Sequence, residues 1–320
     1  MSGETKTARA IARPVPASGD QVHDRIDPFA AGLLVTLCLA WGLNHVSMKI
    51  ANDGLQPVFQ SGLRFALGTI VVFAWCRFRR IALFERDGTL WWGLLIGAIF
   101  GTELAMLNVG LDYTTASRGV VFLYVMPFVV AVGAHFFVPG ERMTWIGFGG
   151  LVLAFVGVVI AFSDKLSLPS PEAVYGDLIC LAAGTIWGIG TLIIKLTPLR
   201  YARAEKLLIY QTAVSAVILL PIAPAFGPLV RDITPMVVVA FTYQVLGVVA
   251  VSFLAWFWLI RHYPAGRLSS FTFLTPMFGV LFGGVLLGEP VSSRLGLALL
   301  LVAAGIYLVN APRPKPAAPG

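Results

Sequence analysis

Residues 28–48 have the sequence PFAAGLLVTLCLAWGLNHVSM, which contains no Lys, Arg, Asp or Glu. A helix needs about 20 mainly apolar residues to cross the hydrocarbon core of a bilayer, and this stretch has that length. Two further apolar stretches, 56–76 and 90–111, each contain one charged residue, Arg64 and Glu103 respectively. The other uncharged stretches of similar length are 119–140, 143–163, 178–194, 207–230, 233–260, 268–288 and 295–312. The sequence therefore predicts an all-α integral membrane protein with ten transmembrane helices.

The composition supports this class of protein. Of the 320 residues, 58% are hydrophobic and only 12% are charged, whereas a soluble globular chain carries about 25% charged residues. This excludes a soluble enzyme, a nucleic-acid-binding domain and a disordered chain. The three cysteines, Cys38, Cys76 and Cys180, all lie in apolar stretches, so no disulfide framework and no metal site is expected.

The positions of Lys and Arg predict how the chain crosses the membrane. With the N-terminus in the cytoplasm, sixteen of these residues fall on the cytoplasmic side and four on the outer side. Cytoplasmic loops of membrane proteins carry such an excess of positive charge. Both termini are therefore expected to be cytoplasmic, and the net charge of +7 needs no acidic partner. The first 28 residues lack an apolar core and are expected to form a tail, not a cleaved signal peptide.

The two halves of the chain resemble each other. Ala40-Trp41-Gly42 corresponds to Ile186-Trp187-Gly188 at an offset of 146 residues. Further along, Arg118 and Pro127 correspond to Arg267 and Pro276 at an offset of 149. Each unit has five helices, an odd number, so the second unit must be inverted in the membrane relative to the first. Inverted repeats are typical of secondary transporters that bind substrate at the repeat interface, although a channel can also be duplicated.

These motifs resemble the EamA repeat of the drug/metabolite transporter superfamily. The first copy carries AWGLNHVSMK at 40–49, Arg64-Phe65, Pro127 and Gly140-Glu141. The second copy carries Gly176-Asp177, Trp187, Pro276 and Gly288-Glu289-Pro290. The resemblance extends from about residue 30 to 311. It implies an exporter of amino acids, metabolites or drugs, with a cavity between the first, third, fourth, sixth, eighth and ninth helices. Arg64 corresponds to Tyr210, so that position is not duplicated.

The expected organisation has five parts. Repeat 1 and repeat 2 are joined by an outer linker and flanked by two cytoplasmic tails; the boundaries are 1–28 for the first tail, 29–162 for repeat 1, 163–173 for the linker, 174–311 for repeat 2 and 312–320 for the second tail. The expected partners are a small-molecule substrate and the lipid bilayer of a bacterial cytoplasmic (inner) membrane. No cofactor, metal or nucleic acid is expected, and whether the chain forms a homodimer stays open.

Two charged residues are expected at similar depth within the membrane. Glu103 and Arg64 both lie about eight residues from the outer ends of their helices. An unpaired charge at that depth costs a few kcal/mol, so the two residues are natural partners. One interpretation is a fixed structural ion pair. The other is that Glu103 faces the cavity, where it contacts a substrate ammonium group or exchanges a proton.

Aromatic and polar side chains complete the predicted substrate site. Trp41 and Trp187 lie too deep to be interfacial anchors, so they either pack between helices or form walls of the cavity. The same two alternatives apply to Tyr124 and its counterpart Phe273. Buried polar groups need hydrogen-bond partners, which water or substrate can supply. The polar candidates are Asn44, His45, Asn108, Tyr243 and Gln244.

Two prolines and two lysines have expected positional roles. Pro127 and Pro276 lie near the middle of their helices and should kink them, either as gating hinges or as static bends. Lys49 and Lys195 are at helix ends and are expected to extend to the membrane surface. Glu141 is expected to cap the next helix or to bind nearby backbone amides.

Together these features predict a secondary transporter that exports amino acids, including aromatic or other apolar ones, or similar small metabolites by alternating access. The sequence does not separate this function from export of drugs or nucleotide precursors, or from a passive facilitator or channel. It contains no Walker A motif and no hydrolase motif, so neither ATP-driven pumping nor enzymatic activity is expected.

Overall fold

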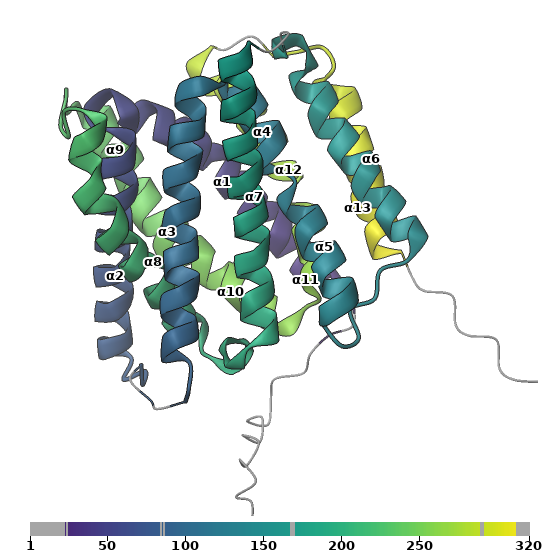
Figure 1. Cartoon of the computed structure of the whole chain (residues 1–320), viewed down its shortest axis with the longest axis horizontal. Helices are drawn as coiled ribbons and strands as arrows, with labels where there is room; N and C mark the ends of the chain where they lie inside the picture. The colour runs from purple at the N-terminus through teal and green to yellow at the C-terminus, as the bar shows by residue number, and fades with distance from the viewer. Residues whose placement is uncertain are drawn as a thin grey trace, which may run out of the picture.

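The computed structural model describes residues 23, 25–83, 85, 87–166, 170–288 and 291–311. Within these residues nine helices are long and apolar enough to cross a membrane, and a tenth, Leu295–Asn310, is apolar but shorter. The helices form an all-α bundle (Figure 1), which confirms the predicted fold class. The expected tails, 1–28 and 312–320, lie almost entirely outside the described residues.

Several of the ten membrane-crossing segments are divided into shorter helices. The bounds are α1 (Pro28–Gly54), α2 (Pro57–Phe78), α3 (Leu90–Tyr113), α4 (Ala116–Leu123), α5 (Met126–Phe137), α6 (Trp145–Phe162), α7 (Pro171–Leu196), α8 (Ala204–Ile222), α9 (Pro235–Tyr243), the π-helix η4 (Gln244–Ser252), α10 (Phe253–His262), α11 (Ala265–Phe271), α12 (Leu274–Leu287) and α13 (Leu295–Asn310).

Local sequence sets where several helices begin. Asp27, Ser170 and Thr234 each precede a proline and accept a hydrogen bond from a backbone N–H in the first turn of α1, α7 and α9 respectively. A side-chain acceptor at this position satisfies one of the free N–H groups of a helix start, and a proline at the first position of a helix loses no intrahelical bond. These starts are therefore encoded by short motifs at the membrane surface.

The two central prolines break their helices, as expected. α4 ends at Leu123, four residues before Pro127, and α11 ends at Phe271, five residues before Pro276. A proline ring clashes with the carbonyl four residues earlier and removes a hydrogen bond, so the break lies on the N-terminal side of each proline. The fourth segment is thus α4 plus α5, and the ninth is α11 plus α12. Whether these breaks act as hinges stays a prediction.

The bundle has two ends, which we define by the helices that meet there. α1 begins and α13 ends at the same end, where residues of both segments line one cavity; this is called the terminal end. Gly54 at the end of α1 and Val230 before α9 lie at the opposite end, where Leu55 and Val230 form a bridge. α7 begins at the opposite end, because Asp177 in its second turn contacts the end of α3. α1 and α7 therefore run in opposite directions.

Helix contacts repeat across the two units. α1 packs on α12 as α7 packs on α5, and α1 packs on α9 and η4 as α7 packs on α3. α2 meets α8, and α6 meets α13, so each of these pairs joins the corresponding helices of the two units. This arrangement agrees with two inverted five-helix repeats.

Glycines set how closely α6 and α13 approach. A Cβ atom at Gly150 would lie 2.6 Å from the carbonyl oxygen of Gly305, and one at Gly305 would lie 2.5 Å from that of Gly150. Small residues allow such backbone contact between membrane helices. The glycine face of α6 therefore packs within the chain, whereas a Cβ at the neighbouring Gly149 would meet nothing within 4 Å.

We expect Gly150→Ala to lower the free energy of unfolding by about 1–3 kcal/mol, because the new methyl group overlaps the backbone of α13. Gly149→Ala is the matched control. It should be neutral or slightly stabilising, since alanine favours a helix over glycine by up to ~1 kcal/mol. Unfolding in detergent, followed by circular dichroism, measures both; equal effects of the two substitutions would contradict the close packing.

Candidate substrate-binding site

Arg64 on α2 is buried in the middle of the bundle. Its Nη1 donates a hydrogen bond of 3.4 Å to Oε1 of Gln244, the first residue of η4. Its guanidinium group lies 4.9 Å from the centre of the Phe65 ring. The buried Nε atom has no hydrogen-bond partner among the described residues. Arg64 therefore keeps an unused donor at the centre of the bundle.

Glu103 on α3 is only 3% exposed, and its Oε2 atom also lacks a partner within the described part of the chain. It lies level with Arg64, because the rings of Phe65 and Phe100 are 5.4 Å apart. The two charges act on each other electrostatically, yet no direct ion pair joins them in the structure described. The expected direct pairing is thus absent from this state, since Arg64 is turned towards Gln244.

Trp41 on α1 is held by the eighth segment. Its Nε1 donates a hydrogen bond of 2.9 Å to Oγ of Ser252, the last residue of η4. Its ring meets that of Trp256 edge-on at 5.4 Å. Trp187, its counterpart on α7, is half-buried and packs against Met126, Val130 and Ala265. The two repeat-related tryptophans therefore have different surroundings.

His45 on α1 is exposed and lies beside α12. Its Nδ1 atom would be 3.7 Å from a Cβ added at Gly279. On the same helix, Asn44 is buried and its Oδ1 has no described partner. Asn108 on α3 is half-buried and donates to its own helix at Leu104.

Tyr243 and Gln244 find their partners on α1. The Tyr243 hydroxyl donates to the carbonyl of Ala40 at 2.9 Å, and Nε2 of Gln244 donates to the carbonyl of Ser47 at 3.1 Å. Gln244 thus connects Arg64 to α1. π-helical turns are rare and occur often at functional sites. No sequence feature indicated η4, and Ser252 was not among the predicted site residues.

Tyr124 and Phe273 lie at the two proline breaks and face each other with ring centres 6.1 Å apart. Both are buried, and Phe128 and Phe155 complete the aromatic cluster around Phe273. In this state these side chains pack in the core. A role as cavity walls stays a prediction.

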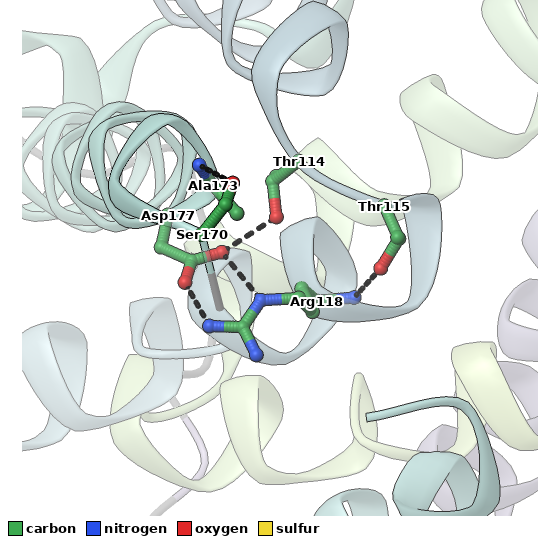
Figure 2. Close-up of polar contacts among 6 residues, drawn as sticks. All are labelled: Thr114, Thr115, Arg118, Ser170, Ala173 and Asp177. Carbon is green, nitrogen blue, oxygen red and sulfur yellow. Dashed lines mark hydrogen bonds and ion pairs between the residues drawn. The ribbon is translucent and has the colours of Figure 1, made fainter. Parts of the chain in front are cut away.

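An ion pair joins the two repeats at the opposite end (Figure 2). Arg118 at the start of α4 donates from Nε to Oδ1 of Asp177 on α7 at 3.2 Å and from Nη2 to Oδ2. Thr114 donates to Oδ1 of the same carboxylate at 2.7 Å. Such a bidentate contact is stronger than a simple ion pair. It fixes the start of α4 against α7.

A second cross-repeat contact lies at the terminal end. Oε1 of Glu141, in the loop before α6, lies 3.1 Å from Nζ of Lys195 on α7. Its Oε2 accepts a hydrogen bond of 2.7 Å from the N–H of Ala265, the first residue of α11. Lys195 also donates to the carbonyl of Tyr263 at 2.6 Å. These four residues form a ring that we call the terminal ring.

The terminal ring corrects one expectation and refines another. Lys195 does not extend to the membrane surface, because it is buried and paired. Glu141 does bind backbone amides, but those of α11 in the other repeat. The sequence motif Gly140-Glu141 indicated a structural role without identifying these distant partners.

Asp27 and Tyr263 join the start of α1 to the same end. The Tyr263 hydroxyl donates to Oδ2 of Asp27 at 2.7 Å. The N–H of Ala30 and this hydroxyl group hold the pKa of Asp27 below its ordinary value. Burial, together with the bond to Asp27, raises the pKa of Tyr263 to about 12. This phenol therefore stays a donor at physiological pH.

A cavity of about 1050 Å³ opens at the terminal end, beside the terminal ring. Basic side chains dominate its charged lining: Arg142, Lys195, Arg200, Arg203, Arg261 and Arg267. The sequence-predicted site residues do not line it. The candidate site is therefore the set of central side chains around Arg64 and Glu103, whereas Glu141 and Lys195 of the terminal ring line the cavity.

A ten-helix bundle of two related five-helix units with buried charges near its centre is typical of a membrane transporter. The chain belongs to the EamA-like transporter family, within the drug/metabolite transporter superfamily, because the family model matches residues 28–163 and 174–311. It is thus a multi-pass membrane transporter and not an enzyme, as the sequence predicted.

Relatives from several organisms match over most of their length. An uncharacterised transporter of Bacillus subtilis is 24% identical over 86% of this chain and 94% of its own. A probable amino-acid metabolite efflux pump of Escherichia coli is 27% identical over 86% of this chain and 93% of its own. One solved structure has the same fold, with a TM-score of 0.77, 20% identity, and coverage of 88% of this chain and 98% of the other.

We expect Glu141→Ala to cost roughly 3–5 kcal/mol of unfolding free energy, because it leaves the buried ammonium group of Lys195 without its counter-ion. Asp164→Ala is the matched control. It removes an ion pair of 3.0 Å to Arg294 whose side chains are 54% and 46% exposed, and exposed pairs contribute about 0–1 kcal/mol. Unfolding by a denaturing detergent compares the two variants. Similar losses of unfolding free energy would contradict a large contribution of the terminal ring to stability.

Proposed function

We propose that this transporter exports amino acids or similar small zwitterionic metabolites by alternating access. The observation that carries the proposal is the pair of unused polar atoms at the centre, Oε2 of Glu103 and Nε of Arg64. A buried charge without full hydrogen bonding is costly, so a ligand that supplies the missing partners is stabilised there. An ammonium group suits Glu103 and a carboxylate suits Arg64.

The apolar part of the substrate would meet the tryptophans. Trp41 and Trp187 flank the centre from α1 and α7, and large ring faces suit an apolar or aromatic side chain. His45 is exposed inside the bundle, which supports access for water or substrate to that level. Asn44, Asn108, Tyr243 and Gln244 supply further polar groups, while Tyr124 and Phe273 would line the site once the helix breaks open.

The helix contacts support a state closed at the terminal end. α5 and α11, the halves of the fourth and ninth segments nearest that end, pack on each other. Their other halves, α4 and α12, do not pack closely on each other in the described chain; α4 packs on α7 and α12 packs on α1. The halves of the two segments therefore diverge towards the opposite end. Pro127 and Pro276 would act as hinges when this divergence reverses.

The basic lining of the terminal cavity supports a cytoplasmic location for that end. On this orientation both termini are cytoplasmic, and the protein lies in a bacterial inner membrane with the contact between α5 and α11 on its cytoplasmic side. Repeat 1 (29–162) and repeat 2 (174–311) would be the moving halves. The name of the Escherichia coli relative, a probable amino-acid metabolite efflux pump, supports the direction and the substrate class.

We expect proteoliposomes containing the protein to take up a few labelled amino acids with saturation and mutual competition. Glu103→Gln, Trp41→Ala and the double variant should each reduce uptake at least about tenfold, which corresponds to the loss of one charge-assisted contact of ~1.4 kcal/mol or more. Trp145→Ala is the control, because Trp145 is 90% exposed and is the first residue of α6.

Other outcomes would change the assignment. Unaltered uptake by the Glu103→Gln and Trp41→Ala double variant would remove the central support of the proposal. Uptake without saturation would indicate a passive facilitator or channel. Saturable uptake of nucleotide precursors or drugs, with no response to amino acids, would keep the carrier and replace its substrate.

A further inference from the structure

The partner of Trp41 has a repeat-related counterpart that carries a charge. Trp41 corresponds to Trp187 at an offset of 146, and Ser252 corresponds to Glu103 at the offset of 149 that relates Arg118 to Arg267. The hydrogen bond from Trp41 to Ser252 joins the first segment to the eighth. Its counterpart would join the sixth segment to the third, from the Trp187 indole N–H to the Glu103 carboxylate.

Packing between α3 and α7 places these two residues opposite each other. A Cβ at Gly110 on α3 would lie 2.7 Å from Sγ of Cys180 on α7. Glu103 and Trp187 each lie seven residues from this contact towards the terminal end, which is about two helical turns or ~10.5 Å. On the terminal side of these two residues, a Cβ added at Gly190 on α7 would lie 3.1 Å from Cγ2 of Ile99 on α3.

Only one of the two related hydrogen bonds exists in this state. Trp41 is bonded to Ser252 at 2.9 Å. In the described part of the chain, Oε2 of Glu103 is buried without a partner and the indole N–H of Trp187 makes no hydrogen bond. The two repeats therefore differ at equivalent positions, although each carries both the donor and an acceptor.

We propose that the two bonds alternate: Trp41 binds Ser252 when the terminal end is closed, and Trp187 binds Glu103 when it is open. This inference rests on the alternating access in the proposed function. In an inverted-repeat carrier the opposite state arises when each repeat adopts the conformation of the other, so the bond made by one tryptophan is lost as the other forms. Ser252 and Trp187 are positioning residues in this scheme.

The exchange assigns Glu103 two competing donors. In the present state its Oε2 atom has no donor among the described residues, and a cationic or N–H-bearing group of the substrate would supply one. In the other state the Trp187 indole occupies it, and this competition would help to displace the substrate. A serine at position 252 cannot bind a substrate cation as strongly, so the two halves of the cycle differ in affinity.

The experiment measures the distance between spin labels at the terminal end, without substrate. The labels are attached through Phe137→Cys at the exposed end of α5 and Trp258→Cys on α10. The native cysteines, Cys38, Cys76 and Cys180, are buried, so the chain without introduced cysteines is the labelling blank. Opening of the terminal end separates α5 from α11 and lengthens the distance.

We expect Ser252→Ala and Trp41→Phe each to raise the ratio of long to short distances about fivefold, the effect of one net hydrogen bond. Adding Trp187→Phe to Ser252→Ala should return the ratio to near that of the doubly labelled protein that carries neither substitution. The controls are Ser215→Ala, which removes a buried hydroxyl bonded only to backbone carbonyls, and Trp145→Phe at an exposed position.

The proposal is overturned if Trp187→Phe leaves the shifted ratio unchanged or increases it, or if Ser252→Ala and Trp41→Phe act no differently from the controls. If Ser252→Ala does not fold, Trp41→Phe tests the same bond from its other side. Because no substrate is present, these outcomes are separate from those of the uptake assay. If the substitutions shift the distances as expected but the protein takes up no amino acid, the substrate assignment is wrong and the exchange of the two hydrogen bonds stands.

Discussion

Inside a bilayer a polar group has no water to bind, so each one must find its partner within the protein. This constraint explains most polar contacts of the bundle. Tyr243 and Gln244 donate to carbonyls of α1, and Lys195 is bonded on two sides. Among the described residues a few buried polar atoms have no partner, and two of them, Oε2 of Glu103 and Nε of Arg64, belong to charged groups at the centre of the bundle. A partner for them has to come from outside the chain or from another conformation.

The helix α7 connects the two ends of the molecule. Asp177 near its start pairs with Arg118, and Lys195 near its end pairs with Glu141. Arg118 lies at the start of the fourth segment and Glu141 in the loop after it, so the fourth and sixth segments are held together at both ends. The bond from Glu141 to Ala265 differs in kind, because it crosses to the ninth segment. In the proposed alternating access, opening the terminal end would break this bond, whereas the two ion pairs would persist.

The number of helices, their inversion and the proline breaks could be predicted from the sequence, because each depends on local composition or on spacing along the chain. The partner of Lys195 could not, since Glu141 and Tyr263 are brought to it only by the folded bundle. Helix-end position suggested extension to the membrane surface, but tertiary pairing prevailed. The π-helix η4 could not be predicted from the sequence either, because it contains no proline. Its register depends on the contacts of Gln244 with α2 and of Ser252 with α1.

The fold is duplicated, but the chemistry at its centre is not. Arg64 corresponds to Tyr210 and Glu103 to Ser252, so the two charges belong to the first repeat alone. In the proposed alternating access, the two related backbones would exchange their shapes between the two states. Asymmetry of the side chains would make those states chemically different, because Glu103 would face a different set of groups in each. Unequal binding of the substrate would then shift the populations of the two states, whereas the net direction of transport would follow the concentration gradients.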